Sequence, residues 1–331
     1  MKKGINVLSL FDGLSCGSIA LERAGIQVNK YFACEIDKYA IQIANKNYPG
    51  IIQLGDVLGV KGKDLPKIDL LIGGSPCQDL SFAGKGKGLI KGDRSSLFYQ
   101  YVRLLKECKP KYFLLENVRM KQEYQDIISD LLGVQPIKIN SSLVSAQNRV
   151  RLYWTNIPNV TQPEDKGILL KDILLDDAEE PMLSNIYGGF KEKKPRVHTN
   201  KSVTIRAASG GGAIPSIKLK QHTIMSEKFT NRNSKAGCLV DSNKPKASSF
   251  SAMEYVKNGR QGDYIKCDSN GMHTIDGRKY RKLHPIEVER LQTIPDGYTE
   301  GVSNTQRYKM LGNSWTADVI AHLFKGLKDG E

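Results

Sequence analysis

The stretch INVLSLFDGLSCGSIALERAG, residues 5–25, decides the fold class of this chain. Its first seven residues, INVLSLF, form an apolar run of the length of a buried strand, and residues 17–24 have the pattern of a helix that ends at Gly25. Gly13 and Gly17 lie where the strand passes into the helix, so the backbone there can approach a ligand closely. A strand, a glycine-rich turn and a helix in this order are typical of nucleotide-binding α/β folds.

The same alternation continues along the chain. Strands are predicted at residues 30–35, 68–72 and 112–116, and helices at residues 38–47, 96–107, 285–294 and 314–327. Because helices that connect parallel strands form right-handed βαβ units, we expect a doubly wound, mostly parallel sheet of the α/β class.

Positive charge is concentrated in one segment. The chain of 331 residues has a net charge of +14, and residues 182–282 contribute +13 of it, with twenty lysines and arginines against seven aspartates and glutamates. Gly, Ser, Asn and Lys are frequent there, and scattered aromatic residues favour a small loop-rich domain over a disordered insert. A basic block in an otherwise balanced chain indicates a polyanionic partner, and a merely lysine-rich surface is the alternative.

Several classes of protein are disfavoured by composition. No apolar run reaches the length of a membrane-spanning helix, and the N-terminal residues form a first strand rather than a signal peptide. The six cysteines are scattered, without CxxC pairs or zinc-ligand spacing, and the histidines suggest no metal site. We therefore expect a cytoplasmic protein that binds neither a membrane nor a metal.

Acidic residues follow the predicted strands near the glycine-rich turn. Glu35 lies at the end of the second strand, and Asp56 follows the next strand-like segment. In nucleotide-binding α/β folds, an acid at the position of Glu35 binds ribose hydroxyls. The turn departs from the GxGxxG pattern of NAD-binding proteins, so a nucleoside without a pyrophosphate, such as S-adenosylmethionine, fits better.

One cysteine differs from the others in its surroundings. Cys77 lies in GGSPCQ, residues 73–78, directly after a predicted strand, where α/β enzymes place their chemistry. The glycines and the proline form a tight turn that can hold the sulfur exposed. We expect Cys77 to be a nucleophile, and Cys16, Cys34 and Cys108 to be small buried apolar residues.

Six motifs, in their order along the chain, resemble those of cytosine-C5 DNA methyltransferases. They are FDG with Gly17 (residues 11–17), GGSPCQ (73–78), ENV (116–118), QNRVRLYW (147–154), RKLHPIEVERLQTIPD (281–296) and GNSW (312–315). The resemblance covers the chain except the variable segment near residues 182–280. The LSLFDG opening and the GNSW closing look most like the de novo methyltransferases of animals and their bacterial and phage relatives.

The resemblance implies the S-adenosylmethionine-dependent methyltransferase fold. Residues 1–181 and 283–331 would form the catalytic and cofactor-binding domain, and residues 182–282 the target-recognition domain. Cys77 would attack C6 of the target cytosine, and Glu116 would contact N3 and the exocyclic amine. Arg149 and Arg151 would hold the base and its phosphate and support the thiolate. The residues expected to bind S-adenosylmethionine are Phe11, Asp12, Gly13, Gly17, Glu35, Ile36, Asp56, Asn313, Ser314 and Trp315.

The implied activity is methylation of cytosine C5 within a specific duplex DNA sequence, on a base flipped out of the helix. A tRNA cytosine-C5 methyltransferase of the same fold and a catalytically inactive DNA-binding homologue are the alternatives. The long basic segment favours double-stranded DNA as the substrate. The intact Cys77, Glu116 and Arg149 favour an active enzyme over an inactive homologue. We expect such an enzyme to be located at the nucleoid. The sequence leaves open the recognised site and whether a separate restriction endonuclease is a partner.

Overall fold

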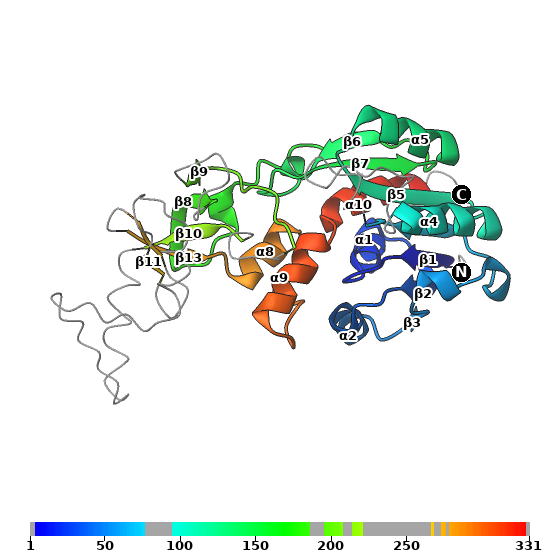
Figure 1. Ribbon diagram of the computed structural model, residues 1–331, viewed down its shortest axis with the longest axis horizontal. Helices are drawn as coiled ribbons and strands as arrows, with labels where there is room; N and C mark the ends of the chain where they lie inside the picture. Colours follow the sequence, from blue (N-terminus) through cyan, green and yellow to red (C-terminus); the bar gives the residue numbers. More distant parts are fainter. Residues whose placement is uncertain are drawn as a thin grey trace.

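The computed structural model of the protein describes residues 4–76, 95–185, 195–207, 214–220, 266–267, 273–275 and 278–328. Two β-sheets organise these residues, and two helices, α8 (Pro285–Leu291) and α9 (Asn304–Asn313), lie between them (Figure 1). The larger sheet has seven strands: β1 (Ile5–Leu10), β2 (Val28–Cys34), β3 (Ile51–Gln53), β4 (Leu70–Gly73), β5 (Tyr112–Val118), β6 (Ile137–Asn140) and β7 (Val150–Thr155).

The strand order of the larger sheet is β3-β2-β1-β4-β5-β7-β6. The strands from β3 to β5 run parallel, whereas β7 is antiparallel to both β5 and β6. The order changes direction at β1, which pairs with β2 on one side and β4 on the other. Ligands bind at such switch points in doubly wound sheets, beyond the carboxyl ends of the strands. The mostly parallel, doubly wound fold expected from the sequence is confirmed.

Helices cover both faces of this sheet because its strands are runs of buried residues, and successive side chains point to opposite faces. Val7 packs on the face of α1 (Cys16–Ala24) and α10 (Ala317–Phe324). Leu8 and Leu10 pack on the opposite face, against α4 (Ser95–Cys108) and α5 (Gln122–Leu132). Helix α2 (Lys38–Asn47) begins after Asp37, whose side chain accepts a hydrogen bond from the amide of Tyr39.

The smaller sheet is antiparallel, with the strand order β11-β12-β13-β10-β8-β9. Its strands are β8 (Ala178–Ser184), β9 (Arg196–His198), β10 (Ser216–Leu219), β11 (Lys266–Cys267), β12 (His273–Ile275) and β13 (Arg278–Lys282). Met182 and Ile217 from this sheet share a core with residues of α8 and α9. Much of the basic segment 182–282 lies outside the described residues, so its status as a separate domain stays a prediction.

Two of the expected absences concern the part of the chain that the structure describes. None of the helices there combines the length and the apolar character needed to cross a membrane. Nor do three or more His, Cys, Asp or Glu side chains gather there in a group suited to a metal ion.

Candidate active site

Glu116 is the centre of a polar cluster at the carboxyl end of the parallel strands. It lies on β5, which pairs with the antiparallel strand β7, and this pairing sets Val118 opposite Arg151. Nε of Arg151 lies 3.0 Å from Oε1 of Glu116, and the two side chains are only 13% and 11% exposed. Nε1 of Trp315 donates to Oε2 of Glu116 over 3.1 Å. One carboxylate oxygen is therefore ion-paired with a cation, and the other accepts a hydrogen bond.

The segment that leads to Cys77 lies against this carboxylate. Gly73 on β4 pairs with Leu115 on β5, so Gly74 lies beside Glu116. A Cβ at Gly74 would lie 3.1 Å from Oε2 of Glu116, and Nδ2 of Asn117 donates to Oγ of Ser75 over 3.3 Å. Cys77 itself lies outside the described residues.

Arg149 is placed differently from Arg151. It is 3% exposed, and its guanidinium donates to the carbonyl oxygens of Ile205 at 2.9 Å, Gly312 at 3.2 Å and Ser314 at 2.8 Å. Burial, together with the positive charge of the neighbouring Arg151, lowers its pKa to about 9. The guanidinium thus joins the residue before β7 to Ile205 and to the C-terminal end of α9. Its predicted contact with the base and its phosphate stays a prediction.

The glycine-rich turn after β1 is tied to the end of β2. Phe11 and Gly13 have positive φ angles of 57° and 59°, which end the strand one residue earlier than predicted. The amide of Asp12 donates to the carbonyl of Cys34 over 3.1 Å, and the amide of Gly13 donates to Oε2 of Glu35 over 2.8 Å. The Glu35 carboxylate therefore holds the turn in place from the neighbouring strand.

The Asp12 side chain is only partly exposed to solvent. It accepts hydrogen bonds from the hydroxyls of Ser15 and, over 2.7 Å, Tyr31. Burial raises its pKa to about 6 even though these hydrogen bonds lower it. Gly17 leaves room for the same tyrosine, since a Cβ there would lie 2.6 Å from the Tyr31 hydroxyl oxygen.

Of the other predicted cofactor residues, Ile36 and Asp56 follow strands of the larger sheet, whereas Asn313 and Ser314 lie at the end of α9. Ile36, after β2, is 75% exposed, and Asp56, after β3, is exposed and accepts a hydrogen bond from the amide of Leu58. Asn313, at the end of α9, is exposed, whereas Ser314 is buried and donates to the carbonyl of Leu311. The structure thus gathers an exposed apolar side chain and carboxylates at the carboxyl ends of β2 and β3.

A comparison with protein families assigns the chain. Residues 5–329 match the sequence pattern of the family described as "C-5 cytosine-specific DNA methylase". The chain belongs to this family. The family expected from the six motifs is therefore confirmed over nearly the whole length of this methylase.

Curated relatives of the methylase match over most of their length. The orphan methyltransferase M.SPRI of Bacillus phage SPR is 28% identical, over 98% of this chain and 97% of the relative. The type II methyltransferase M.HhaI of Haemophilus parahaemolyticus is 26% identical, over 97% of this chain and 93% of the relative. A solved structure, the methyltransferase EhMeth of Entamoeba histolytica, shares the fold with a TM-score of 0.64 at 17% identity, over 99% of both chains.

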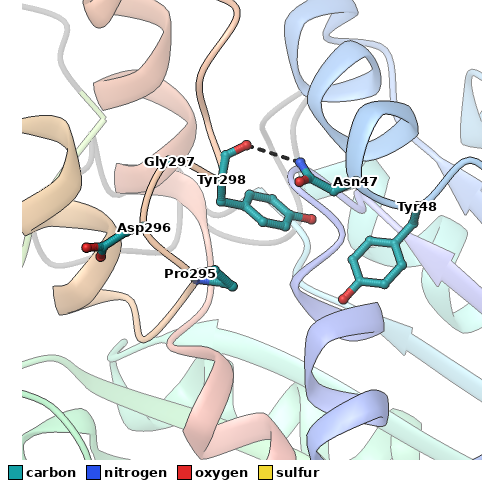
Figure 2. A pocket seen from close by; sticks show the side chains of 6 residues that line it. All are labelled: Asn47, Tyr48, Pro295, Asp296, Gly297 and Tyr298. Atoms are coloured by element: carbon teal, nitrogen blue, oxygen red, sulfur yellow. Dashed lines mark hydrogen bonds between the residues drawn. The ribbon is translucent and has the colours of Figure 1, made fainter.

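The methylase has a pocket of about 230 Å³ whose lining does not include Glu116 (Figure 2). It is lined by Asn47, Tyr48, Pro295, Asp296, Gly297 and Tyr298. Nδ2 of Asn47 donates to the carbonyl of Tyr298 over 3.1 Å, and the tyrosine hydroxyl donates to the carbonyl of Leu14 over 2.7 Å. None of the predicted site residues that the structure describes belongs to this lining. The hydroxyl of Tyr298 supports the glycine-rich turn by its hydrogen bond to the backbone carbonyl of Leu14.

Three residues around Glu116 were not among the predicted site residues. Gly74, Ser75 and Asn117 all lie within quoted motifs, but only the structure brings the two motifs together. The doubled glycine before SPC was the available signal, since a glycine after a strand often marks a close approach of another group.

Proposed function

We propose that this methylase transfers a methyl group from S-adenosylmethionine to C5 of a cytosine flipped out of duplex DNA. The reaction passes through a covalent bond between Sγ of Cys77 and C6 of the base. The observation that carries the proposal is the Glu116 carboxylate, which is nearly buried, held at both oxygens and adjacent to the segment that leads to Cys77. Family membership and the catalytic motifs add support.

The residues at the carboxyl edge of the sheet fit S-adenosylmethionine. The exposed side chain of Ile36 offers apolar surface for an adenine, and the exposed carboxylate of Asp56 offers an acceptor for polar hydrogens of the nucleoside. The turn at Gly13 has open space, since nothing lies within 4 Å of a Cβ built there. When bound, S-adenosylmethionine supplies the electrophilic methyl group that C5 takes up.

The chemistry of the protein begins at Cys77. Its thiolate adds to C6, and the displaced electron pair makes C5 a carbon nucleophile, which divides one difficult step into easier ones. Glu116 contacts N3 and the exocyclic amine and withdraws charge from the ring as the thiolate adds. After methylation, the C5 proton leaves to water and the thiolate leaves C6, which restores the aromatic ring.

The two arginines support this step in different ways. Arg151 holds Oε1 of Glu116 and adds positive charge that favours a thiolate at Cys77. Arg149 adds further positive charge from a buried position, where it fixes the loop at Ser314. Both contributions are electrostatic, and they act in a site where little water competes.

Residues 182–282 form the target-recognition domain in this proposal, and residues 1–181 and 283–331 form the catalytic domain. The +13 charge of the recognition segment attracts the phosphates of duplex DNA and offsets the cost of flipping the base, a few kcal/mol. The site sequence is read by side chains of this segment at the base edges.

The test is bisulfite sequencing of the genome of a bacterium without its own cytosine methylation that expresses this protein. A Cys77→Ala variant, expressed at the same level, is the matched control. Methylated cytosines in one short sequence context, absent from the variant, are expected. If folded wild-type protein leaves the DNA unmethylated, duplex DNA is the wrong substrate, and methylation of tRNA in the same cells would then identify the alternative.

A further inference from the structure

Trp315 makes a contact that its predicted role at the cofactor does not require. Its indole N–H donates to Oε2 of Glu116, so it serves the carboxylate that we propose contacts the cytosine. The two residues are 199 positions apart in the sequence. Trp315 belongs to the short connection between α9 and α10, and Glu116 lies on β5.

The residues on either side of Trp315 are anchored, one through its backbone and the other through its side chain. The carbonyl of Ser314 accepts a hydrogen bond from Arg149, and Oγ1 of Thr316 accepts one from Oγ of Ser141 over 2.8 Å. Ser314 and Thr316 are 7% and 2% exposed. The direction of the indole is therefore set by buried neighbours.

The loop before Cys77 fits closely around the indole and the carboxylate. A Cβ at Gly74 would lie 2.8 Å from Nε1 of Trp315, which is closer than real Cβ contacts. Only glycine leaves the hydrogen bond between Trp315 and Glu116 undisturbed. This packing joins the donor, the carboxylate and the segment leading to the nucleophile.

We propose that Trp315 is a positioning residue for catalysis, which acts by holding Oε2 of Glu116. A carboxylate held only by Arg151, at one oxygen, could still rotate about its Cγ–Cδ bond. A second donor on the other oxygen fixes the plane of the carboxylate before the base arrives, so that less reorganisation is needed in the transition state. The inference rests on the proposed function of Glu116.

The kinetic test uses Trp315→Phe, which keeps an aromatic ring and removes the N–H donor. Loss of a hydrogen bond to a charged group predicts a fall in kcat of about tenfold, with the KM for DNA and for S-adenosylmethionine each within about threefold of the wild type. Trp154→Phe is the matched control, because its indole donates to Ser129 inside the core. Its kcat is expected to stay within about twofold of the wild type.

A fluorescence measurement tests the same contact without activity. The chain has two tryptophans, so Trp154→Phe leaves Trp315 as the only one. Adding Glu116→Gln to that variant replaces the charged acceptor, and the emission maximum or intensity of Trp315 is expected to change. Unchanged emission would overturn the proposed contact. Circular dichroism and thermal melting check that each variant is folded.

The outcomes separate this inference from the proposed function. Folded wild-type protein that leaves duplex DNA unmethylated contradicts the proposed function itself. If the wild type is active and Trp315→Phe has an unchanged kcat, the positioning role is wrong. A raised KM for S-adenosylmethionine at an unchanged kcat would also overturn it, because Trp315 would then act only on the cofactor.

Discussion

Arg281 on β13 forms an ion pair with Glu287 on α8, and the side chain of Glu287 is completely buried. Both nitrogens at the end of the guanidinium lie 2.8 Å from an oxygen of this carboxylate. The glutamate also accepts hydrogen bonds from the amides of Leu175 and His284, so the pair joins the smaller sheet to α8 at several points.

Removal of the cation from this pair should destabilise the protein. Arg281→Met leaves a buried carboxylate without its ion pair, and we expect the free energy of unfolding to fall by about 3 kcal/mol in chemical denaturation. Asp296→Asn breaks an exposed pair with Arg290 and should cost less than about 1 kcal/mol. Equal losses in the two variants would show that the buried pair has no special weight.

Gly74→Ala should reduce activity without a comparable loss of stability. The new methyl group would lie 2.8 Å from Nε1 of Trp315 and 3.1 Å from Oε2 of Glu116, so one of the two side chains must move. A fall in kcat/KM of about tenfold or more is expected. Gly50→Ala is the control, because nothing lies within 4 Å of a Cβ there, and its kcat/KM should match the wild type.

The raised pKa of Asp12 predicts how stability depends on pH. Its folded pKa of about 6 exceeds the ordinary value of 3.8, so the folded protein binds the proton more tightly than the unfolded chain. The contribution of this group to stability is therefore present below about pH 4 and is lost as the pH rises through 6. Asp12→Asn removes that dependence.

Unfolding free energies of the wild type and of Asp12→Asn, measured between about pH 4 and 7, check this prediction. The stability of the variant relative to the wild type should increase across that range. A constant difference would mean that Asp12 titrates alike in both states.

Binding of duplex DNA should weaken steeply with salt, because residues 182–282 contribute +13 of the charge. We expect the affinity for duplex DNA, measured by fluorescence anisotropy, to fall roughly tenfold or more between about 50 and 200 mM salt. The affinity for S-adenosylmethionine should change little over the same range. A salt-independent affinity for DNA would contradict the electrostatic role of this segment.

Local patterns predicted the parts of the fold that depend on neighbouring residues. Helix α2 has the predicted bounds, because its periodicity coincides with a capping aspartate, Asp37. Helix α1 ends at Gly25 as expected, with a φ of 67° that glycine adopts readily. The insertion of β7 between β5 and β6 had no local signal, since strand order is set by contacts far apart in the chain.

In the candidate site, too, local patterns predicted some features but not those that depend on contacts far apart in the chain. Glu116 and Arg151 were predicted from motifs to be site residues, and the structure places the two side chains in contact. The partners of Arg149 are the backbone carbonyls of residues 205, 312 and 314. Because every residue has a backbone carbonyl, the sequence could not predict these hydrogen bonds. The roles of all these residues in catalysis stay predictions.

The packing of α10 over the first strands has a consequence for synthesis on the ribosome. Val319, Ile320 and Phe324 cover the face of the larger sheet that includes Val7 and Leu70. At ~5–20 residues per second, on the order of 15 to 60 s separate the completion of α1 from the appearance of α10. During that interval the nascent chain carries an uncovered apolar surface, which makes it a substrate for chaperones.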